Sequence, residues 1–388
     1  MSALKELRVL FFLRRIGPYH HARFNEARKK LDLIAVETRP LSEEYPWEFD
    51  PGDEYGIERF PASDEKETGL RGQRLEAEVK RILEKHHPDV VVTTGWADPE
   101  YHAVVLAARA TNIPCVVISD SRHEDEPRKF YKEAIKRVIL RSYSAALAAG
   151  TASRGYLVRL GFDSSRIFQP WDVVDNQYFG IERNEGVVPY HERPIICVSR
   201  FIPKKNLPRL IEAFGLYRGN GGSRRLLLIG SGEQERMLRD QIDRHRLGDQ
   251  VEITGFVQYE QLPTYFSRAH CLILPSTTDQ WGLVVNEAMA AGLPVLVSQN
   301  CGCAADLVRD KENGCIFDPF RVDDIANNLL FMSGISESSW KEMGKASRTI
   351  IANWDLEDFS QGLRDACRHA LNYAPRQAPK WIHRLLSR

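Results

Sequence analysis

Hydrophobic and polar positions alternate along the whole chain in one recurring order. A short apolar run is followed by a turn and then, in most cases, by a segment whose apolar residues repeat at helical spacing. Continuous apolar runs are typical of parallel strands that are buried on both faces, and their alternation with helices predicts βαβ units. The predicted strands cover residues 8–13, 33–37, 90–93, 115–118 and 145–148 in the first half, and 195–198, 225–229, 251–253, 271–274 and 295–297 in the second.

The helices of the second half are expected to begin near Asn206, Glu233, Tyr259 and Leu283, and after Gly314 the pattern turns helical. These last helices are predicted over residues 323–331, 337–353 and 356–373. The fold class is therefore α/β, with two doubly wound, Rossmann-like domains that face a central cleft. In such sheets ligands bind outside the carboxyl ends of the strands.

The boundary between the two domains is predicted from a change in composition. Residues 176–193 are polar, contain Gly and Pro, and lack apolar periodicity, which indicates a linker. The first domain then covers residues 1–175 and the second 194–353. Residues 354–388 form a helix that is expected to cross back to the first domain, followed by a basic tail.

Bulk composition narrows the class of protein. The 388 residues suit two domains, and 53 basic against 53 acidic side chains leave no net field that would favour nucleic acid as a partner. The apolar run at residues 9–13 is too short for a signal sequence, and no stretch approaches the roughly 20 apolar residues of a membrane span. A cytoplasmic location is expected, and seven scattered cysteines fit a reducing compartment.

Metal and redox cofactors are not expected. Cys301 and Cys303 form a C-x-C pair, but no second Cys or His pair lies at ligand spacing. The turn at Gly230 and Gly232 lacks the third glycine of a dinucleotide fingerprint, which disfavours a nicotinamide or flavin enzyme.

An anion site is predicted where strand 195–198 leads into the next helix. Arg200 follows the strand and Lys205 precedes the helix, so two cations lie beside unpaired helix N–H groups. A planar guanidinium and a mobile ammonium suit a diphosphate. Two solvated loop charges are the competing interpretation. Gly230 and Gly232 at the following strand end allow a ligand to approach the backbone.

The stretch TTDQWGLVVNEAMAAGLPVLVS places two carboxylates around a helix start. Asp279 lies in the loop, Glu287 lies one turn into the helix, and the N–H groups near Gly282 and Leu283 can hold a phosphate. Carboxylates accept paired hydrogen bonds from sugar hydroxyls. The pattern therefore favours a sugar–diphosphate–nucleoside. Further candidates for donor binding are Phe256 and Val257, which can hold a base, and Trp281, although Phe256 is equally suited to a core position.

On these residues the sequence resembles the family 4 retaining glycosyltransferases of GT-B fold, most closely from 195 to 317. In that family the Arg and Lys corresponding to Arg200 and Lys205 bind the donor diphosphate. The family motif Glu-x7-Glu falls on Asp279 and Glu287, of which the second binds the ribose and the first contacts the transferred sugar. Asp279 is shorter than the usual Glu by one methylene, about 1.5 Å, which bears on the choice of sugar.

The resemblance implies a hexosyltransferase whose substrate is a nucleotide-diphosphate sugar, with no other cofactor. No Asp-x-Asp motif with helpful flanks appears, and the cations of Arg200 and Lys205 can replace a divalent metal, so a metal-independent reaction is expected. The first domain would bind the acceptor and the second the nucleotide sugar. Acceptor-side candidates follow the first-domain strands, although a structural role is the competing interpretation for each histidine. They are Gly17, His20, His21, Trp96, Asp98 and His123, with Glu100, Asp120 and Arg122 beside them.

Basic segments suggest a further partner. Residues 128–141 carry six cations against Glu133, and the tail from residue 374 onward carries Trp381, Ile382, Leu385 and Leu386 at helical spacing among cations. Such segments either lie peripherally on an anionic membrane at its cytoplasmic face or form solvated helix faces. The membrane interpretation fits a lipid-linked or saccharide acceptor in surface polysaccharide assembly. A sugar-nucleotide epimerase and a non-catalytic sugar-nucleotide-binding subunit remain alternative functions.

Overall fold

The computed structural model describes residues 6–39, 49–52, 56–61, 70–181, 188–375 and 377–387. The chain divides into two compact units. Unit 1 comprises residues 1–173 together with 356–388, and unit 2 comprises residues 174–355. The helix from residue 356 onward thus belongs to the same unit as the N-terminal half.

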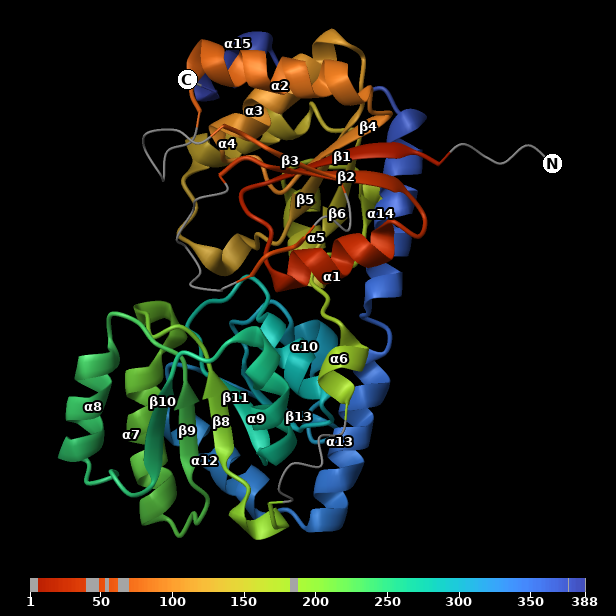
Figure 1. The fold of residues 1–388 in the computed structure, drawn as a ribbon. Helices are drawn as coiled ribbons and strands as arrows, with labels where there is room; N and C mark the ends of the chain where they lie inside the picture. Colours follow the sequence, from red (N-terminus) through yellow and green to blue (C-terminus); the bar gives the residue numbers. More distant parts are fainter. Residues whose placement is uncertain are drawn as a thin grey trace. The chain divides into compact units, whose positions relative to one another are not determined.

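Unit 1 contains, over its described residues, a seven-stranded sheet of order β3-β2-β1-β4-β5-β6-β7, and every pairing is parallel. Figure 1 shows α2, α3 and α15 on one side of this sheet and α1 on the other, while α14 packs beside α1 and against β6 and β7. The strands are β1 (Arg8–Leu13), β2 (Asp32–Glu37), β3 (Ile57–Arg59), β4 (Val90–Thr93), β5 (Cys115–Ser119), β6 (Ala145–Ala148) and β7 (Ile167–Phe168). The helices are α1 (Pro18–Ala27), α2 (Gly72–His86), α3 (Pro99–Ala110), α4 (Phe130–Leu140), α5 (Thr151–Arg159), α14 (Leu356–Leu371) and α15 (Lys380–Leu386).

Unit 2 is built on a six-stranded parallel sheet, counted over the part of the chain that the structure describes, of order β10-β9-β8-β11-β12-β13. Helix α7 packs with α8 and α12, and α10 packs with α13 and α6 (Figure 1). The strands are β8 (Ile195–Val198), β9 (Leu226–Ile229), β10 (Val251–Gly255), β11 (Cys271–Leu274), β12 (Val295–Ser298) and β13 (Gly314–Phe317). The helices are α6 (Asn176–Gly180), α7 (Leu207–Gly219), α8 (Glu235–Arg244), α9 (Leu262–Arg268), α10 (Leu283–Ala290), α11 (Ala304–Leu307), α12 (Val322–Gly334) and α13 (Glu337–Ile351).

Each sheet carries its own core. Strands β1, β4, β6, β8, β11 and β12 are buried almost throughout, as expected for strands covered by helices on both faces. The two unit cores form separate hydrophobic clusters. The prediction of two doubly wound α/β sheets is therefore confirmed.

Three strands, β3, β7 and β13, were not predicted from the sequence. β3 and β7 are short edge strands of three and two residues, so their periodicity is too brief to read. The helical interpretation of the chain directly after Gly314 was wrong, because Gly314 opens β13. A Cβ at Gly314 would lie 1.9 Å from the backbone oxygen of Val295, so this glycine serves close strand packing rather than a turn.

The segment predicted as a linker, residues 176–193, contains regular structure. Its first five residues form α6, capped by the Asp175 side chain, which accepts a hydrogen bond from the Tyr178 N–H. Phe179 of this helix is buried and contacts Phe266 edge-on. A single buried aromatic residue in five residues gives no periodic signal, so the helix was not detectable from the pattern.

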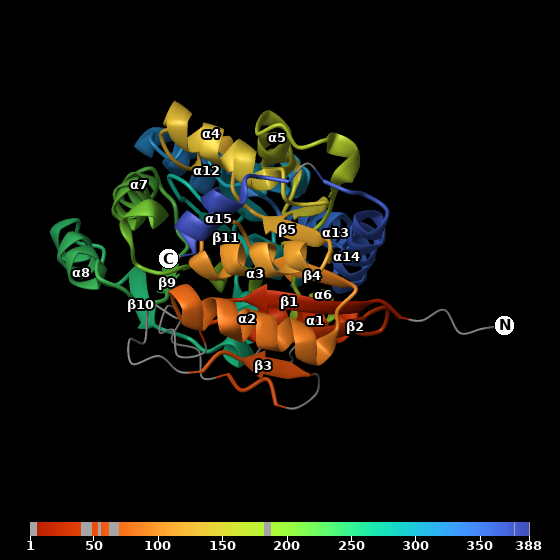
Figure 2. The same ribbon diagram turned by 90° about the horizontal axis from the view of Figure 1, so that it is seen from above.

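Helix α15 packs on α3, as Figures 1 and 2 both show. A buried chain of polar contacts, called here the histidine relay, links His102, His383 and Ser142. The Nδ1 atoms of His102 and His383 are 3.1 Å apart, and His383 Nε2 is 2.9 Å from the Ser142 hydroxyl. Burial lowers the pKa of both histidines to about 4, so both rings are neutral at pH 7. Ile382 joins the unit 1 core, whereas Trp381 and Leu385 are exposed. The tail side chains predicted to share one face therefore lie on two.

Candidate functional site

The carboxyl edge of the unit 2 sheet brings Lys205 and Asp279 together. Lys205 follows β8 in a short 3₁₀ turn, and Asp279 follows β11 in the loop before α10. The Lys205 ammonium donates to Asp279 Oδ2, and the Ser276 hydroxyl donates to the same oxygen at 3.2 Å. Both charged side chains are mostly buried, at 14% and 11% exposure.

The attraction between Lys205 and Asp279 shifts the pKa of each group more than burial does. Burial raises the pKa of Asp279, but the Lys205 ammonium reverses this and leaves the pKa below its ordinary value. Burial likewise lowers the pKa of Lys205, and the Asp279 carboxylate raises it above its ordinary value. Both groups are therefore charged at neutral pH. Among the described residues the ion-pair partner of the Lys205 ammonium is the Asp279 carboxylate, and a buried ammonium paired in this way is well suited to receive a second anion.

Asn206 organises the loops around this pair. Its backbone is left-handed, with φ +60°, and its side-chain amide donates to the carbonyls of Pro275 at 3.0 Å and Pro319 at 2.8 Å. The Lys204 carbonyl accepts a hydrogen bond from the Thr277 N–H at 2.8 Å. These contacts fix the Lys205 turn against the Asp279 loop. From the sequence, Asn206 is predicted only as a helix start; its position directly before a helix is the signal that could have pointed to this role.

The two glycines after β9 are required by backbone packing. A Cβ at Gly230 would lie 1.9 Å from the Ser199 carbonyl oxygen, and one at Gly232 would lie 2.7 Å from the Phe201 carbonyl oxygen. Both have positive φ, +142° and +154°. The Phe201 N–H donates to the Ser231 carbonyl at 2.8 Å. The glycines thus let the β9 turn pack against the loop that leads from β8 to Lys205.

Helix α10 begins as predicted at Leu283, after Gly282 in a left-handed conformation with φ +108°. Glu287 lies on this helix and is 1% exposed. The Trp281 indole N–H donates to Asn286 at 2.9 Å, and its ring contacts Trp354, so this side chain fixes the loop from inside. The carboxyl edge also carries Arg200, which is exposed, and Phe256 and Val257 after β10, which are 38% and 8% exposed.

The carboxyl edge of the unit 1 sheet carries a network of ion pairs. Arg14, directly after β1, holds Asp98 with two hydrogen bonds of 2.8 Å. Arg39, near the end of β2, holds Glu100 at 2.9 and 3.0 Å and also approaches Asp98 at 3.7 Å. Neither arginine was singled out from the sequence, although each comes just after an apolar strand. Burial raises the pKa of Asp98, but the arginines lower it below its ordinary value.

The remaining acceptor-side candidates lie near this edge or behind it. Gly17 caps α1, and its N–H donates to His20 Nδ1 at 3.3 Å. Burial, with Arg23 nearby, lowers the pKa of His20 to about 3, so this ring is neutral. His21 Nε2 is 3.0 Å from the Asn25 amide, and Trp96 belongs to the unit 1 core. The His123 carbonyl accepts a hydrogen bond from Arg128 Nε at 2.7 Å.

Metal-ligand geometry does not appear in the described part of the chain, where no three His, Cys, Asp or Glu side chains are grouped as metal ligands. All seven cysteines are buried free thiols. Among the described helices, none is long and apolar enough to span a bilayer.

Family models match both halves of the chain. The model described as Glycosyl transferases group 1 matches residues 181–348, and the model described as Glycosyl transferase 4-like domain matches residues 27–169. A GDP-mannose-dependent α-(1-6)-phosphatidylinositol monomannoside mannosyltransferase from Mycobacterium tuberculosis is 29% identical over 46% of this chain and 48% of its own length. The amylovoran biosynthesis glycosyltransferase AmsK from Erwinia amylovora is 28% identical over 56% of this chain and 51% of its own. The chain therefore spans about half the length of these curated relatives.

Solved structures with the same fold cover nearly the whole chain. A glycosyltransferase from Rickettsia africae matches with a TM-score of 0.74 and 15% identity over 96% of this chain and 100% of its own. HepE from Anabaena, solved in complex with UDP, matches with a TM-score of 0.72 and 17% identity over 92% of this chain and 99% of its own. At these identities the likeness concerns the fold alone.

Proposed function

Because this chain belongs to the group 1, family 4-like glycosyltransferases of GT-B fold, we propose that it transfers a hexose, with retention, from a nucleotide-diphosphate sugar to a hydroxyl acceptor. One observation carries the proposal. The buried Lys205–Asp279 pair lies at the carboxyl edge of the unit 2 sheet, in the loops that lead into α7 and α10. This is the edge at which doubly wound sheets bind ligands.

The resemblance to the family assigns a role to each donor-site residue, and the chemistry of each side chain is compatible with that role. Lys205, Arg200 and the first N–H groups of α10 bind the diphosphate. Asp279 holds the transferred sugar and Glu287 the ribose. The base lies against Phe256 and Val257, and the backbone at Gly230 and Gly232 completes the site.

The reaction breaks the bond between the anomeric carbon and the diphosphate oxygen, and the bonding electron pair leaves with the diphosphate. The acceptor oxygen forms its bond on the same face of the sugar, and its proton passes to the departing phosphate oxygen. Lys205 and Arg200 stabilise the charge that develops on the leaving group, which makes a divalent metal unnecessary. Activity that EDTA abolishes and Mn²⁺ restores would contradict this mechanism.

The acceptor binds to unit 1, near Gly17, His20, His21, Trp96, Asp98 and His123. We propose a lipid-linked or oligosaccharide acceptor of surface polysaccharide assembly. The support comes from two relatives, one named as a phosphatidylinositol monomannoside mannosyltransferase and the other as an amylovoran biosynthesis glycosyltransferase. A lipid-linked acceptor would be met by a protein that works peripherally at the inner face of the cytoplasmic membrane.

A thermal-shift panel of UDP-, GDP- and ADP-sugars tests the donor proposal. One class of donor should raise the melting temperature of the wild type by mass action, and the Lys205→Ala variant should lose this shift. Release of free nucleoside diphosphate from that donor, measured with and without acceptor extracts, then tests transfer. Interconversion of the sugar on the intact nucleotide would instead indicate an epimerase. Binding with neither hydrolysis nor transfer would indicate a non-catalytic subunit.

A further inference from the structure

Over residues 130–136, helix α4 of unit 1 exposes three apolar side chains and turns two charged side chains inward. Phe130 is 87% exposed, Tyr131 48% and Ile135 45%. Glu133 and Lys136, on the opposite side of the helix, turn toward the body of unit 1. A surface helix normally buries its apolar face and exposes its charges. Residues 130–136 reverse this arrangement, so their apolar side chains stay exposed in unit 1.

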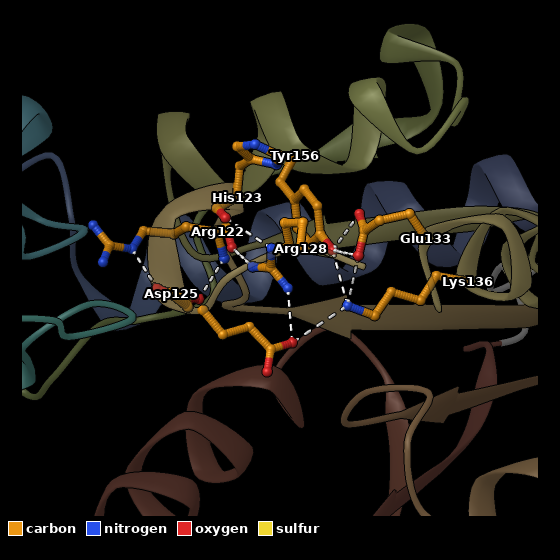
Figure 3. Close-up of polar contacts among 8 residues, drawn as sticks. Arg122, His123, Asp125, Arg128, Glu133, Lys136 and Tyr156 are labelled. Atoms are coloured by element: carbon orange, nitrogen blue, oxygen red, sulfur yellow. Dashed lines mark hydrogen bonds and ion pairs between the residues drawn. The ribbon is translucent and has the colours of Figure 1, made fainter. Parts of the chain in front are cut away.

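The inward face is fixed by a polar network around Tyr156 of α5 (Figure 3). The Tyr156 hydroxyl lies 2.9 Å from both Glu133 oxygens, and the Lys136 ammonium donates to the hydroxyl and to Glu133, each at 3.0 Å. The Arg128 guanidinium stacks over the Tyr156 ring at 4.5 Å. Arg128 also donates to the carbonyls of Arg122 and His123. These contacts all involve the inward face of α4, so they fix the rotation of the helix about its own axis.

Two buried residues add an apolar anchor at the end of the same helix. Ile139 and Leu140 belong to the unit 1 core. Rotating α4 to hide Phe130 would therefore break both the Tyr156 network and this core contact. The exposed apolar face is a stable feature of unit 1 rather than a helix that could turn inward.

The exposed charged side chains at residues 129–141 are cations. Lys129, Lys132, Arg137 and Arg141 are exposed, and Glu133, the acid within the helix, is directed to Tyr156 and Lys136. An apolar strip with a Phe and a Tyr, bordered by cations, matches the headgroup region of a bilayer that contains anionic lipid.

We propose that unit 1 docks on an anionic bilayer through α4, with Phe130, Tyr131 and Ile135 inserted at the headgroup level and the bordering cations paired with lipid phosphates. The inference extends the proposed function by naming the surface that meets the membrane. It does not depend on the transfer reaction, because docking is measurable without donor or acceptor.

The C-terminal helix provides the internal comparison. Trp381 and Leu385 of α15 are 64% and 63% exposed, but Ile382 is in the unit 1 core and His383 is buried in the relay with His102. Truncating the tail would therefore remove core contacts along with the exposed side chains. Substituting Trp381 and Leu385 alone tests their contribution without that complication.

Co-sedimentation with vesicles of phosphatidylcholine, with and without phosphatidylglycerol, tests the proposal. The wild type should bind only the anionic vesicles, and binding should weaken at high salt. Phe130→Ser/Ile135→Ser should lower the apparent affinity at least about tenfold, because two apolar insertions are lost. Lys132→Glu/Arg141→Glu should lower it comparably. Leu216→Ser/Met237→Ser removes two exposed apolar side chains of unit 2, 47% and 41% exposed, and should bind like the wild type.

Three outcomes would overturn the assignment. The wild type binds neither vesicle; or Phe130→Ser/Ile135→Ser binds normally while Trp381→Ser/Leu385→Ser does not; or the wild type is a dimer that Phe130→Ser/Ile135→Ser converts to a monomer, so that a second copy covers α4. A Phe130→Trp variant gives a direct readout, since vesicles should blue-shift its added fluorescence relative to the wild type.

Donor-induced thermal shifts measured on the same variants separate the two proposals. A variant that keeps the donor shift and loses vesicle binding supports the docking surface and leaves donor binding intact. A wild type that binds vesicles but shows no donor shift would refute the donor proposal alone.

Discussion

The carboxyl edges of the two sheets have the same architecture but different chemistry. In unit 1, Arg14 and Arg39 each hold a carboxylate, Asp98 or Glu100, with two hydrogen bonds. In unit 2, a single buried ammonium, Lys205, meets Asp279. An arginine that donates two hydrogen bonds to one carboxylate satisfies the charges of both partners. An ammonium has three N–H donors, so Lys205, which pairs with Asp279 among the described residues, keeps donors for another anion.

The backbone differs in the same sense. At the unit 2 edge, Gly230 and Gly232 pack directly on the loop that leads to Lys205. The unit 1 edge is braced by side chains instead. We infer that the unit 2 edge is shaped for a phosphorylated ligand, whereas the acids at the unit 1 edge mainly hold their own loops in place.

The largest expected effect is the loss of transfer when the unit 2 cation is removed. Lys205→Ala should lower the rate by about 10²–10³-fold, because a group that stabilises the leaving diphosphate is lost. Lys204→Ala is the matched control and should retain most activity. Since Lys205→Ala leaves Asp279 buried without this partner, Lys205→Ala/Asp279→Asn should recover the melting temperature but not the rate. An active double variant would refute the role of Lys205.

A glycine substitution tests the backbone side of the comparison. Gly230→Ala should destabilise unit 2 by about 3 kcal/mol or more, because its Cβ collides with backbone and its φ is unfavourable. Gly155→Ala in α5 meets no atom within 4 Å and should stabilise unit 1 by about 0.5–1 kcal/mol. Urea unfolding of the two variants gives both values, and equal stabilities would contradict the packing argument.

Matched amide substitutions compare the carboxylates. Asp98→Asn should cost about 1–3 kcal/mol through its weakened arginine pairs while leaving the donor-induced thermal shift unchanged. Asp279→Asn should diminish both stability and the donor shift. Asp279→Glu should keep the Lys205 pair and change the preference among donor sugars in competition assays. If Asp98→Asn abolished the donor-induced thermal shift, donor recognition would lie at the unit 1 edge, which would contradict the comparison.

The smallest expected effect is a loss of stability at low pH, through His102 and His383. His102 and His383 have folded pKa values of about 4, below the ordinary 6.5, so the unfolded chain binds their protons first as pH falls. Their stabilisation is complete above pH 6.5 and is lost between pH 6.5 and 4. The Asp279 pKa lies below 3.8, so the Lys205 pair persists over that range.

Proteolysis of α15 should therefore accelerate on acidification before donor binding fails. Limited proteolysis from pH 7 to 4.5, followed by mass spectrometry of the C-terminus, measures the first process, and His383→Gln should flatten its pH dependence. Cleavage that is independent of pH would contradict the relay.

The sequence by itself determined most strands, their alternation with helices, and which side chains the unit 2 loops carry. Apolar runs, helix starts such as Leu283 and the glycine turn at Gly230 are encoded within a few neighbouring residues. These local signals can be read without knowing which residues pack against the segment, because side-chain periodicity and turn geometry depend on short-range sterics.

Only the tertiary structure decided which distant groups meet. Lys205 and Asp279 are 74 positions apart, and Arg14 and Asp98 are 84 apart. Their contacts arise because the parallel strand order brings separate carboxyl ends to one edge. The inward turn of Glu133 on α4 and the split of the tail between Ile382 and Trp381 likewise depend on what packs beside each helix. Burial is a property of neighbours in space, and no pattern along one segment specifies those neighbours.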